Sequence, residues 1–114
     1  MPTTPRPGRP VRGSRTGRPL MALLDLMGRR QALRIIWELR EARLTFRPLQ
    51  DACGGVSPTV LNQRLKELRE SGLVDLREGE GYGLTPLGHE LRRVLRPLRE
   101  WAEERWVKAA SGNA

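Results

Sequence analysis

The stretch SPTVLNQRLKELRESGLV, residues 57–74, decides the fold of this chain. Ser57 is a residue type that caps helix starts, and Pro58 suits the first helical position. Three leucines then recur at helical spacing and form one apolar stripe: Leu61, Leu65 and Leu68. Gly72 follows where a helix commonly ends in a left-handed cap. The spacing predicts a helix with one buried side and one polar side.

The polar side of this helix carries amide, hydroxyl and cationic groups, which can bind base edges and phosphates in a DNA major groove. The predicted DNA-binding residues are Ser57, Pro58, Thr59, Asn62, Gln63, Arg64 and Lys66. Arg64 lies beside the buried stripe, so it can either reach a phosphate or pair with an acidic neighbour. An ordinary solvated amphipathic helix would have the same stripe, and the flanking segments must therefore discriminate between the two interpretations.

The segment before this helix predicts a second, shorter helix. Thr45 can cap a helix that runs to about Cys53, and its inward-facing residues would be Phe46, Leu49 and Ala52. Gly54-Gly55-Val56 then forms a tight turn. Two short helices joined by a three-residue turn with glycine make a helix-turn-helix pattern.

The segment after the residue 57 helix predicts a β-hairpin. Residues 73–77 are expected to form a strand, 79–81 a turn and 82–84 a returning strand. A hairpin directly after a recognition-type helix is a wing, and Arg77 on its first strand is a further candidate for DNA binding.

Three other segments have helical patterns: residues 20–27, ended by Gly28; residues 30–41; and residues 86–107, capped by Thr85. Apolar residues cover more than half the circumference of the second, and those of the last alternate in steps of four and three, as in a coiled-coil seam. Pro97 should kink or split the last helix. This excess of apolar surface predicts a homodimer, with an interface that includes Leu20, Leu24, Trp37, Leu91, Leu98 and Trp101.

Positive charge is concentrated at the N-terminus. The 114 residues have a formal net charge of +8, and residues 1–18 supply five of these charges with no acidic residue: Arg6, Arg9, Arg12, Arg15 and Arg18. Their Pro, Gly and Arg content predicts a disordered arm before a domain of residues 19–108, with a disordered tail at 109–114. The arm is either a solvated tail or a basic arm that follows phosphates or enters the minor groove.

Several classes of protein find no support in the sequence. Cys53 is the single cysteine, so an intrachain disulfide is excluded. The simplest interpretation of Cys53 is a small core residue. No signal peptide or membrane span is evident, so we expect a cytoplasmic protein without a membrane partner. No catalytic motif, cofactor motif or metal-ligand spacing is present, and we expect neither an enzyme nor a metal site.

Residues 19–106 resemble the HxlR-type winged-helix transcription regulators, which are close to MarR-like folds. The resemblance rests on Phe46-x-x-Leu49, on VSPTVLNQRLKEL at 56–68, on Gly72-Leu73-Val74, on YGLTPLG at 82–88 and on Trp101. It implies a mainly α winged helix-turn-helix with a small hairpin. Three departures are visible: Gly28-Arg29-Arg30 lacks the tryptophan that the family has there, the wing is shortened to residues 78–81, and no cysteine lies near the N-terminus.

Together these features predict a homodimeric transcription regulator that binds double-stranded DNA at a pseudo-palindromic operator. Two alternatives stay open. The acidic wing tip, with Glu78 and Glu80, would suit a winged helix that binds protein instead of DNA. The basic arm would suit a nonspecific nucleic-acid binder. A transcription regulator can also respond to a small-molecule effector, but no residue pattern in this sequence identifies one.

Overall fold

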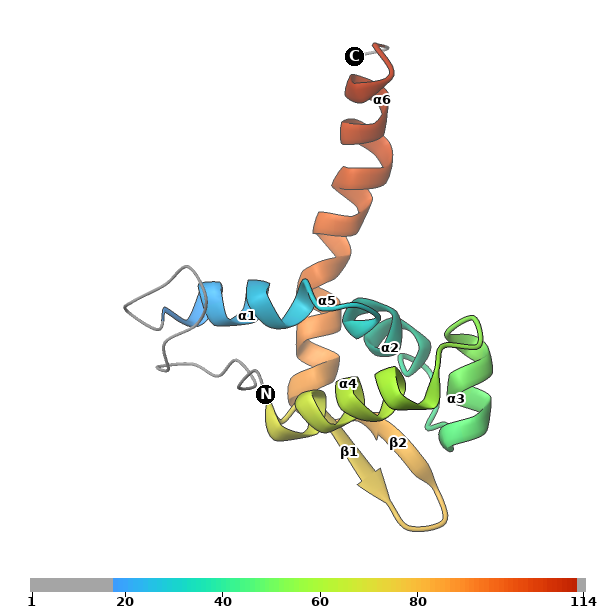
Figure 1. Ribbon diagram of the computed structural model, residues 1–114. Helices are drawn as coiled ribbons and strands as arrows, with labels where there is room; N and C mark the ends of the chain where they lie inside the picture. Colours follow the sequence, from blue (N-terminus) through green and yellow to red (C-terminus); the bar gives the residue numbers. More distant parts are fainter. Residues whose placement is uncertain (1–17, 113–114) are drawn as a thin grey trace.

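The computed structural model describes residues 18–112. The elements follow in the order α1 (Pro19–Met27), α2 (Ala32–Glu38), α3 (Phe46–Ala52), α4 (Pro58–Glu70), β1 (Val74–Arg77), β2 (Gly81–Leu84), α5 (Pro86–Trp101), the π-helical segment η1 (Ala102–Trp106) and α6 (Val107–Ala110) (Figure 1). Helices α1, α2 and α4 lie around the first turns of α5, α3 lies on the side of the domain away from α1, and the hairpin extends below α4 (Figure 1). The predicted mainly α winged-helix fold is confirmed.

Helix α4 begins and ends as its sequence predicts. The Ser57 Oγ accepts a hydrogen bond from the Val60 amide at 3.2 Å, and Pro58 occupies the first turn. After the helix, Gly72 has a φ of 79°, which glycine adopts without steric cost. The amide of Leu73 donates to the carbonyl of Leu68 at 3.0 Å, which closes the left-handed cap.

The hairpin pairs Val74 with Leu84 and Arg77 with Gly81 in an antiparallel register. A third segment joins it, because Leu44 and Tyr82 exchange backbone hydrogen bonds of 2.9 and 2.8 Å. Gly81 has a φ of 86°, and a Cβ atom there would collide with the Leu44 backbone. The glycine therefore permits this close approach, which ties the wing to the segment before α3 and which the sequence did not predict.

The core lies where α2, α3, α4 and the hairpin meet the start of α5. Its largest side chains that are almost wholly excluded from solvent are Ile35, Ile36, Leu39, Leu49, Leu61, Leu65 and Leu68. The predicted apolar stripe of α4 is thus confirmed as core. Phe46 and Ala52 of α3 are only half-buried, and Thr45 occupies the N-cap position without a side-chain hydrogen bond.

The second helix is shorter than the predicted range of 30–41. Gln31 has a φ of 72°, a left-handed conformation that interrupts the helical path before Ala32. At the other end, Leu39 has a φ of −94° and a ψ of 9°, and the helix stops there. Both predicted boundaries were therefore wrong, although Ile35, Ile36 and Leu39 of this apolar segment are buried in the core.

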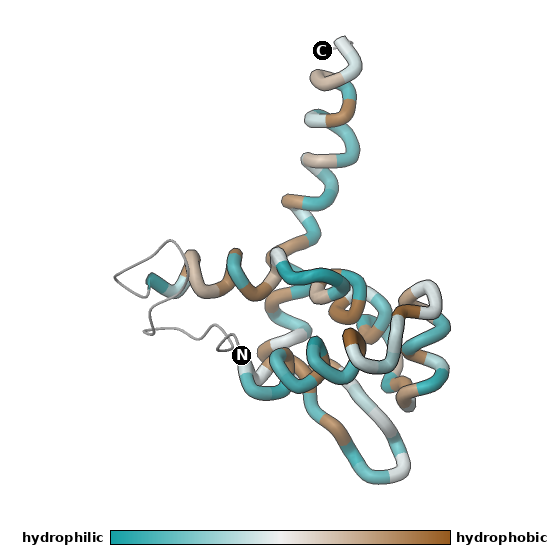
Figure 2. The backbone as a smooth tube through the Cα atoms, viewed as in Figure 1, coloured by the Kyte–Doolittle hydropathy of each residue, from teal (hydrophilic) through white to brown (hydrophobic). Residues whose placement is uncertain are grey.

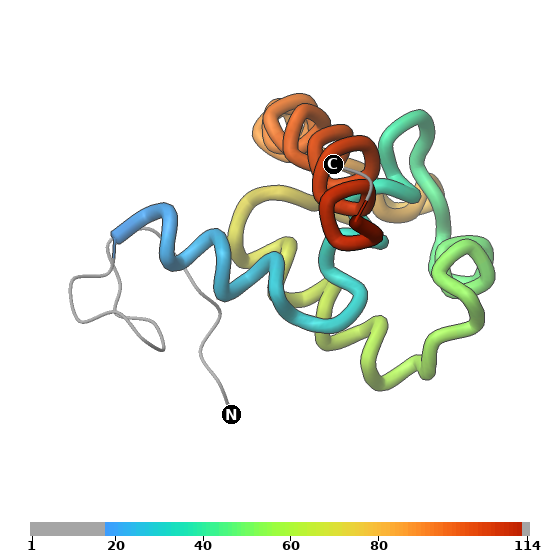
Figure 3. Tube along the Cα trace, turned by 90° about the horizontal axis from the view of Figure 1, so that it is seen from above, coloured from blue at the N-terminus to red at the C-terminus, as the bar shows by residue number. Residues whose placement is uncertain are grey.

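Of the two outcomes predicted at Pro97, a kink or a split of the last helix, the split does not occur. Helix α5 continues through Pro97 to Trp101, although an interior proline removes one helical hydrogen bond and its ring crowds the preceding turn. The departure from α geometry falls later, in η1, and α6 then extends the helix to Ala110. This long helix projects away from the other elements (Figure 1), and Figure 3 views it nearly end-on.

Candidate nucleic-acid interface

The start and outer side of α4 carry five of the predicted DNA-binding residues in exposed positions. These are Ser57, Pro58, Thr59, Asn62 and Lys66, and we refer to the last three as the outer face of α4. The helical spacing that buries the leucines directs these three toward solvent. The outer face offers a hydroxyl, an amide and an ammonium group along one helix surface, which is the chemistry that base edges and phosphates accept.

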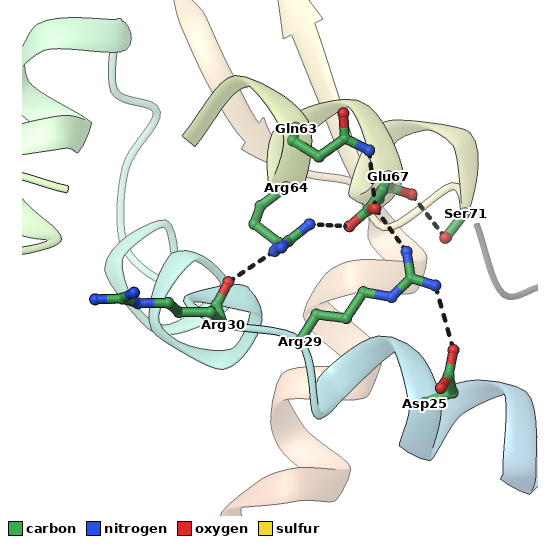
Figure 4. A network of polar contacts seen from close by, with 7 residues as sticks. All are labelled: Asp25, Arg29, Arg30, Gln63, Arg64, Glu67 and Ser71. Atoms are coloured by element: carbon green, nitrogen blue, oxygen red, sulfur yellow. Dashed lines mark hydrogen bonds and ion pairs between the residues drawn. The ribbon is translucent and has the colours of Figure 1, made fainter. Parts of the chain in front are cut away.

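Gln63 and Arg64, the other two predicted contacts on α4, are held by Glu67 on the same helix. The Gln63 Nε2 donates to Glu67 Oε2 at 3.0 Å, and the Arg64 Nη1 donates to Glu67 Oε1 at 2.8 Å. Figure 4 shows both groups converging on the carboxylate, while the Gln63 Oε1 points away from it. Of the two roles open to Arg64, pairing with an acidic neighbour is the one present in the unbound protein.

Glu67 is buried, with 1% of its surface exposed, although it lies on a charged helix. A third donor reaches it from another part of the chain: the Arg29 Nη1 lies 2.6 Å from Glu67 Oε2, and Arg29 also pairs with Asp25 of α1 (Figure 4). Burial raises the pKa of Glu67, but the hydrogen bonds from Gln63 and Arg64 and the charges of Arg64 and Arg29 outweigh burial, so the pKa lies below its ordinary value. The carboxylate stays charged and joins α4 to α1.

The irregular start of α2 supports this network. The Arg64 Nε donates to the carbonyl of Arg30 at 2.9 Å. Had the helix begun at Arg30, as predicted, that carbonyl would accept a bond from within the helix. The sequence analysis missed Glu67 and Arg29. The spacing of Gln63 and Arg64, four and three residues before Glu67, was an available signal, because such side chains share a helix face.

The wing has a mixed charge. Arg77 is exposed at the end of β1, and the turn beyond it exposes Glu78 and Glu80. Arg43, which the sequence analysis did not select, clamps the hairpin, because its Nη2 donates to the Asp75 carboxylate at 2.5 Å and to the Gly81 carbonyl at 2.8 Å. Arg43 therefore ties the two strands of the wing to the segment before α3, while the tip of the wing, with one arginine and two glutamates, has a net negative charge.

Of the five arginines of the predicted arm, only Arg18 lies within the described residues. Arg18 is exposed directly before α1, whereas Arg6, Arg9, Arg12 and Arg15 lie outside the described residues. The predicted DNA contacts of the arm stay predictions, as do those of α4 and the wing.

The predicted interface residues fall into two groups. Leu20, Leu24, Leu98 and Trp101 are more than half exposed, whereas Leu91 and Trp37 are half-buried. In Figure 2 the C-terminal helix shows hydrophobic segments along its whole length, well away from the domain. Trp37 already has cationic neighbours, since the guanidinium carbons of Arg40 and Arg99 lie 3.8 and 4.1 Å from its ring centre.

Other chemistry receives little support from the described part of the chain. No group of three or more His, Cys, Asp or Glu side chains within residues 18–112 could hold a metal ion. Cys53 is buried, and this burial, with a smaller contribution from Glu38, raises the pKa of its thiol. Within the same residues, no helix is long and apolar enough to span a membrane.

Comparison with known proteins identifies the family of this chain. A sequence model of the HxlR-like helix-turn-helix family matches residues 26–110. The chain belongs to this family. It is 29% identical, over 90 residues that cover 74% of this chain and 82% of the relative, to the HTH-type transcriptional regulator YvaP of Bacillus subtilis.

Solved structures agree. A possible HxlR family transcriptional factor from Thermoplasma volcanium is 34% identical, with a TM-score of 0.65, over 71% of this chain and 78% of that chain. Quinone-bound YodB from B. subtilis is 27% identical, with a TM-score of 0.70, over 75% of this chain and 96% of that chain. The HxlR-type protein described here is accordingly a winged helix-turn-helix transcriptional regulator, a class that binds DNA, and the relatives are regulators rather than enzymes.

Proposed function

We propose that this regulator acts as a homodimer that inserts one α4 per subunit into successive major grooves of a pseudo-palindromic operator. The observation that carries the proposal is the outer face of α4, which is exposed while the opposite side of the helix is core. A two-fold dimer of this kind binds half-sites roughly one helical turn, or ~34–36 Å, apart.

The contacts of α4 divide by chemistry. The Asn62 amide can bind an adenine edge, Lys66 suits a phosphate, and Ser57, Pro58 and Thr59 lie at the helix start, where helix-turn-helix proteins meet bases and backbone. Gln63 already donates to Glu67, so it would use its Oε1 to accept from a base amino group. Arg64 would have to leave Glu67 to reach a phosphate.

The wing and the arm would contribute electrostatically. Arg77 can bind a phosphate, but Glu78 and Glu80 at the wing tip repel the same backbone. Residues 19–114 hold 16 basic and 13 acidic side chains, so the five arginines of residues 1–18 form the most concentrated positive charge. We infer that the arm supplies affinity that the acidic wing tip lacks.

The operator is tested by selecting genomic DNA fragments with the purified full-length protein and footprinting the selected site. We expect two protected half-sites related by a two-fold axis and one turn apart. Protection of a single half-site, or of no defined site, would contradict dimeric operator binding.

The dimer is tested separately. The exposed apolar side chains of α1 and α5 exceed what a small soluble monomer normally presents. Sedimentation of the wild type at micromolar concentration should give twice the subunit mass, and Leu98→Glu should give the subunit mass. Arg93→Glu is the matched control, because Arg93 is exposed on α5 outside the leucine seam. A wild type that sediments as a monomer would contradict the assignment.

A second candidate, nonspecific binding through the arm, is favoured by the uneven charge distribution. It predicts equal affinity for operator and random duplex, with a linear dependence of log affinity on log salt concentration. A regulator that reads bases should bind the operator more tightly at every salt concentration.

A further inference from the structure

A cavity of about 850 Å³ lies between α2 and the C-terminal half of α5. Its apolar wall includes Leu33, Ile36 and Trp37 from α2, and Leu95 and Leu98 from α5. A volume of this order accommodates one drug-sized organic molecule.

The charged part of the lining has an excess of arginines. Five of them face two glutamates: Arg34, Arg40, Arg92, Arg96 and Arg99, with Glu41 and Glu100. Arg96 pairs with Glu100 at 3.0 Å, Arg40 with Glu41 at 3.7 Å, and Arg34 with Glu38 at 2.7 Å. Among the described residues, no carboxylate lies within ion-pair distance of Arg92 or Arg99.

Two details indicate that these cations need a counter-charge. The Nε of Arg92 is buried without a hydrogen-bond partner in the described part of the chain, and a buried donor without a partner costs stability. The guanidinium of Arg99 shares the Trp37 ring with that of Arg40, so two like charges are drawn to one aromatic group. A bound anion would lower the free energy of both arrangements.

We propose that this cavity binds an organic anion with an apolar body, such as an aromatic carboxylate. The carboxylate pairs with Arg92 and Arg99, and the ring packs against Ile36 and Leu95. The binding itself does not depend on DNA, whereas a role as the effector site of the regulator rests on the proposed function. Because α2 and α5 both belong to the proposed dimer surface, occupancy of the cavity would alter how two subunits meet.

Isothermal titration of the full-length protein with 2-naphthoate tests the site. We expect one site per subunit, and at least tenfold weaker binding of both 2-naphthalenemethanol, which lacks the charge, and acetate, which lacks the ring. Arg92→Gln should weaken 2-naphthoate binding at least tenfold. Arg93→Gln is the matched control, since it removes the same charge from the next residue, which does not line the cavity, and it should leave binding unchanged.

Arg99→Gln provides a second variant if Arg92→Gln fails to fold, because Arg99 is exposed and its replacement is tolerable. Equal binding of the acid and the alcohol would overturn the proposal, and so would equal losses in the Arg92 and Arg93 variants. Absence of binding by a wild type that sediments as a dimer would also overturn it, and would indicate that a second copy covers the cavity. The proposed operator function would survive each of these outcomes, because no DNA is present in the titration.

Discussion

Helices α4 and α5 have the same kind of apolar stripe, but the stripe of α4 is buried and that of α5 is largely exposed. In α4, Leu65 is 1% exposed, whereas in α5, Val94 and Leu98 are 67% and 59% exposed. The difference lies in what the chain brings to each helix: α4 is covered by α2, α3 and the hairpin, while most of α5 projects beyond them (Figure 1). A periodic stripe therefore predicts that a helix needs a covering surface, and only the fold shows that the chain itself provides that surface for α4.

The largest expected effect is on α4. Leu65→Ala should cost about 2–5 kcal/mol of unfolding free energy, because it leaves a cavity in a packed core. Leu98→Ala should cost less than about 0.5 kcal/mol in a dilute sample, as for other exposed sites. Urea unfolding at several protein concentrations measures both. Under the dimer proposal, the destabilisation by Leu98→Ala should grow with concentration, since burial in an interface contributes only when the dimer forms. Equal effects of the two variants at every concentration would remove the distinction between the helices.

The next effect concerns the buried carboxylate that joins α4 to α1. Glu67→Ala should cost about 3 kcal/mol, because it leaves Arg29 and Arg64 without their shared counter-charge.

Since the pKa of Glu67 is lowered in the folded protein, its contribution is complete above the pKa of an unfolded glutamate, about 4.3, and is lost as the pH falls through the lower folded value. The free energy of unfolding, measured from pH 7 to pH 2, should fall less steeply in Glu67→Gln than in the wild type, because the variant lacks this titrating carboxylate. Glu78→Gln, at the exposed wing tip, should retain the wild-type pH dependence, and an unaltered pH profile in Glu67→Gln would exclude this role.

Features that obey local rules could be predicted from the sequence. The caps at Ser57 and Thr85 formed as expected, the latter with a 3.0 Å bond from the Gly88 amide to the Thr85 Oγ1. The leucine stripe of α4 and the hairpin were likewise recognised, because helix and strand periods are written in neighbouring residues. The family resemblance identified the winged helix as a whole.

Features that depend on distant residues could not be predicted. The left-handed Gln31 shortened α2, although nothing adjacent to it resembles a helix stop. Glu67 looked like an exposed residue of a charged helix, and its burial depends on Arg29, which is 38 residues away in the sequence. The bridge from Leu44 to Tyr82 spans a similar separation. The candidate side chains on α4 could be named in advance, while the contacts of Glu67 that constrain Gln63 and Arg64 depend on the fold.

A smaller effect should separate the free and the constrained side chains of α4. Asn62→Ala should cost about 1–3 kcal/mol on the selected operator and little on random duplex, if its exposed amide reads a base. Gln63→Ala should show the same preference with an effect toward the lower end, because its amide is partly engaged by Glu67. Titration of labelled operator and random DNA at one salt concentration compares the two. A variant whose affinity falls equally on both DNAs does not carry a base-reading residue.

The smallest effect on the folded domain should come from the arm. Deleting residues 1–17 removes four arginines and almost no apolar side chains, so the unfolding free energy should change by less than about 0.5 kcal/mol. DNA affinity should nevertheless fall on every sequence, and the log–log salt slope should become shallower by about 0.9 for each phosphate that the protein no longer neutralises. A full-length variant with Arg6, Arg9, Arg12 and Arg15 changed to Gln keeps the length while removing the charge, and should behave like the deletion.

If the arm also enters the minor groove, the decrease in affinity should be larger beside A·T-rich flanks, where the groove is narrow and more negative. An unchanged slope in both variants would mean that Lys66, Arg77 and the other cations of the folded domain carry the electrostatic part of binding.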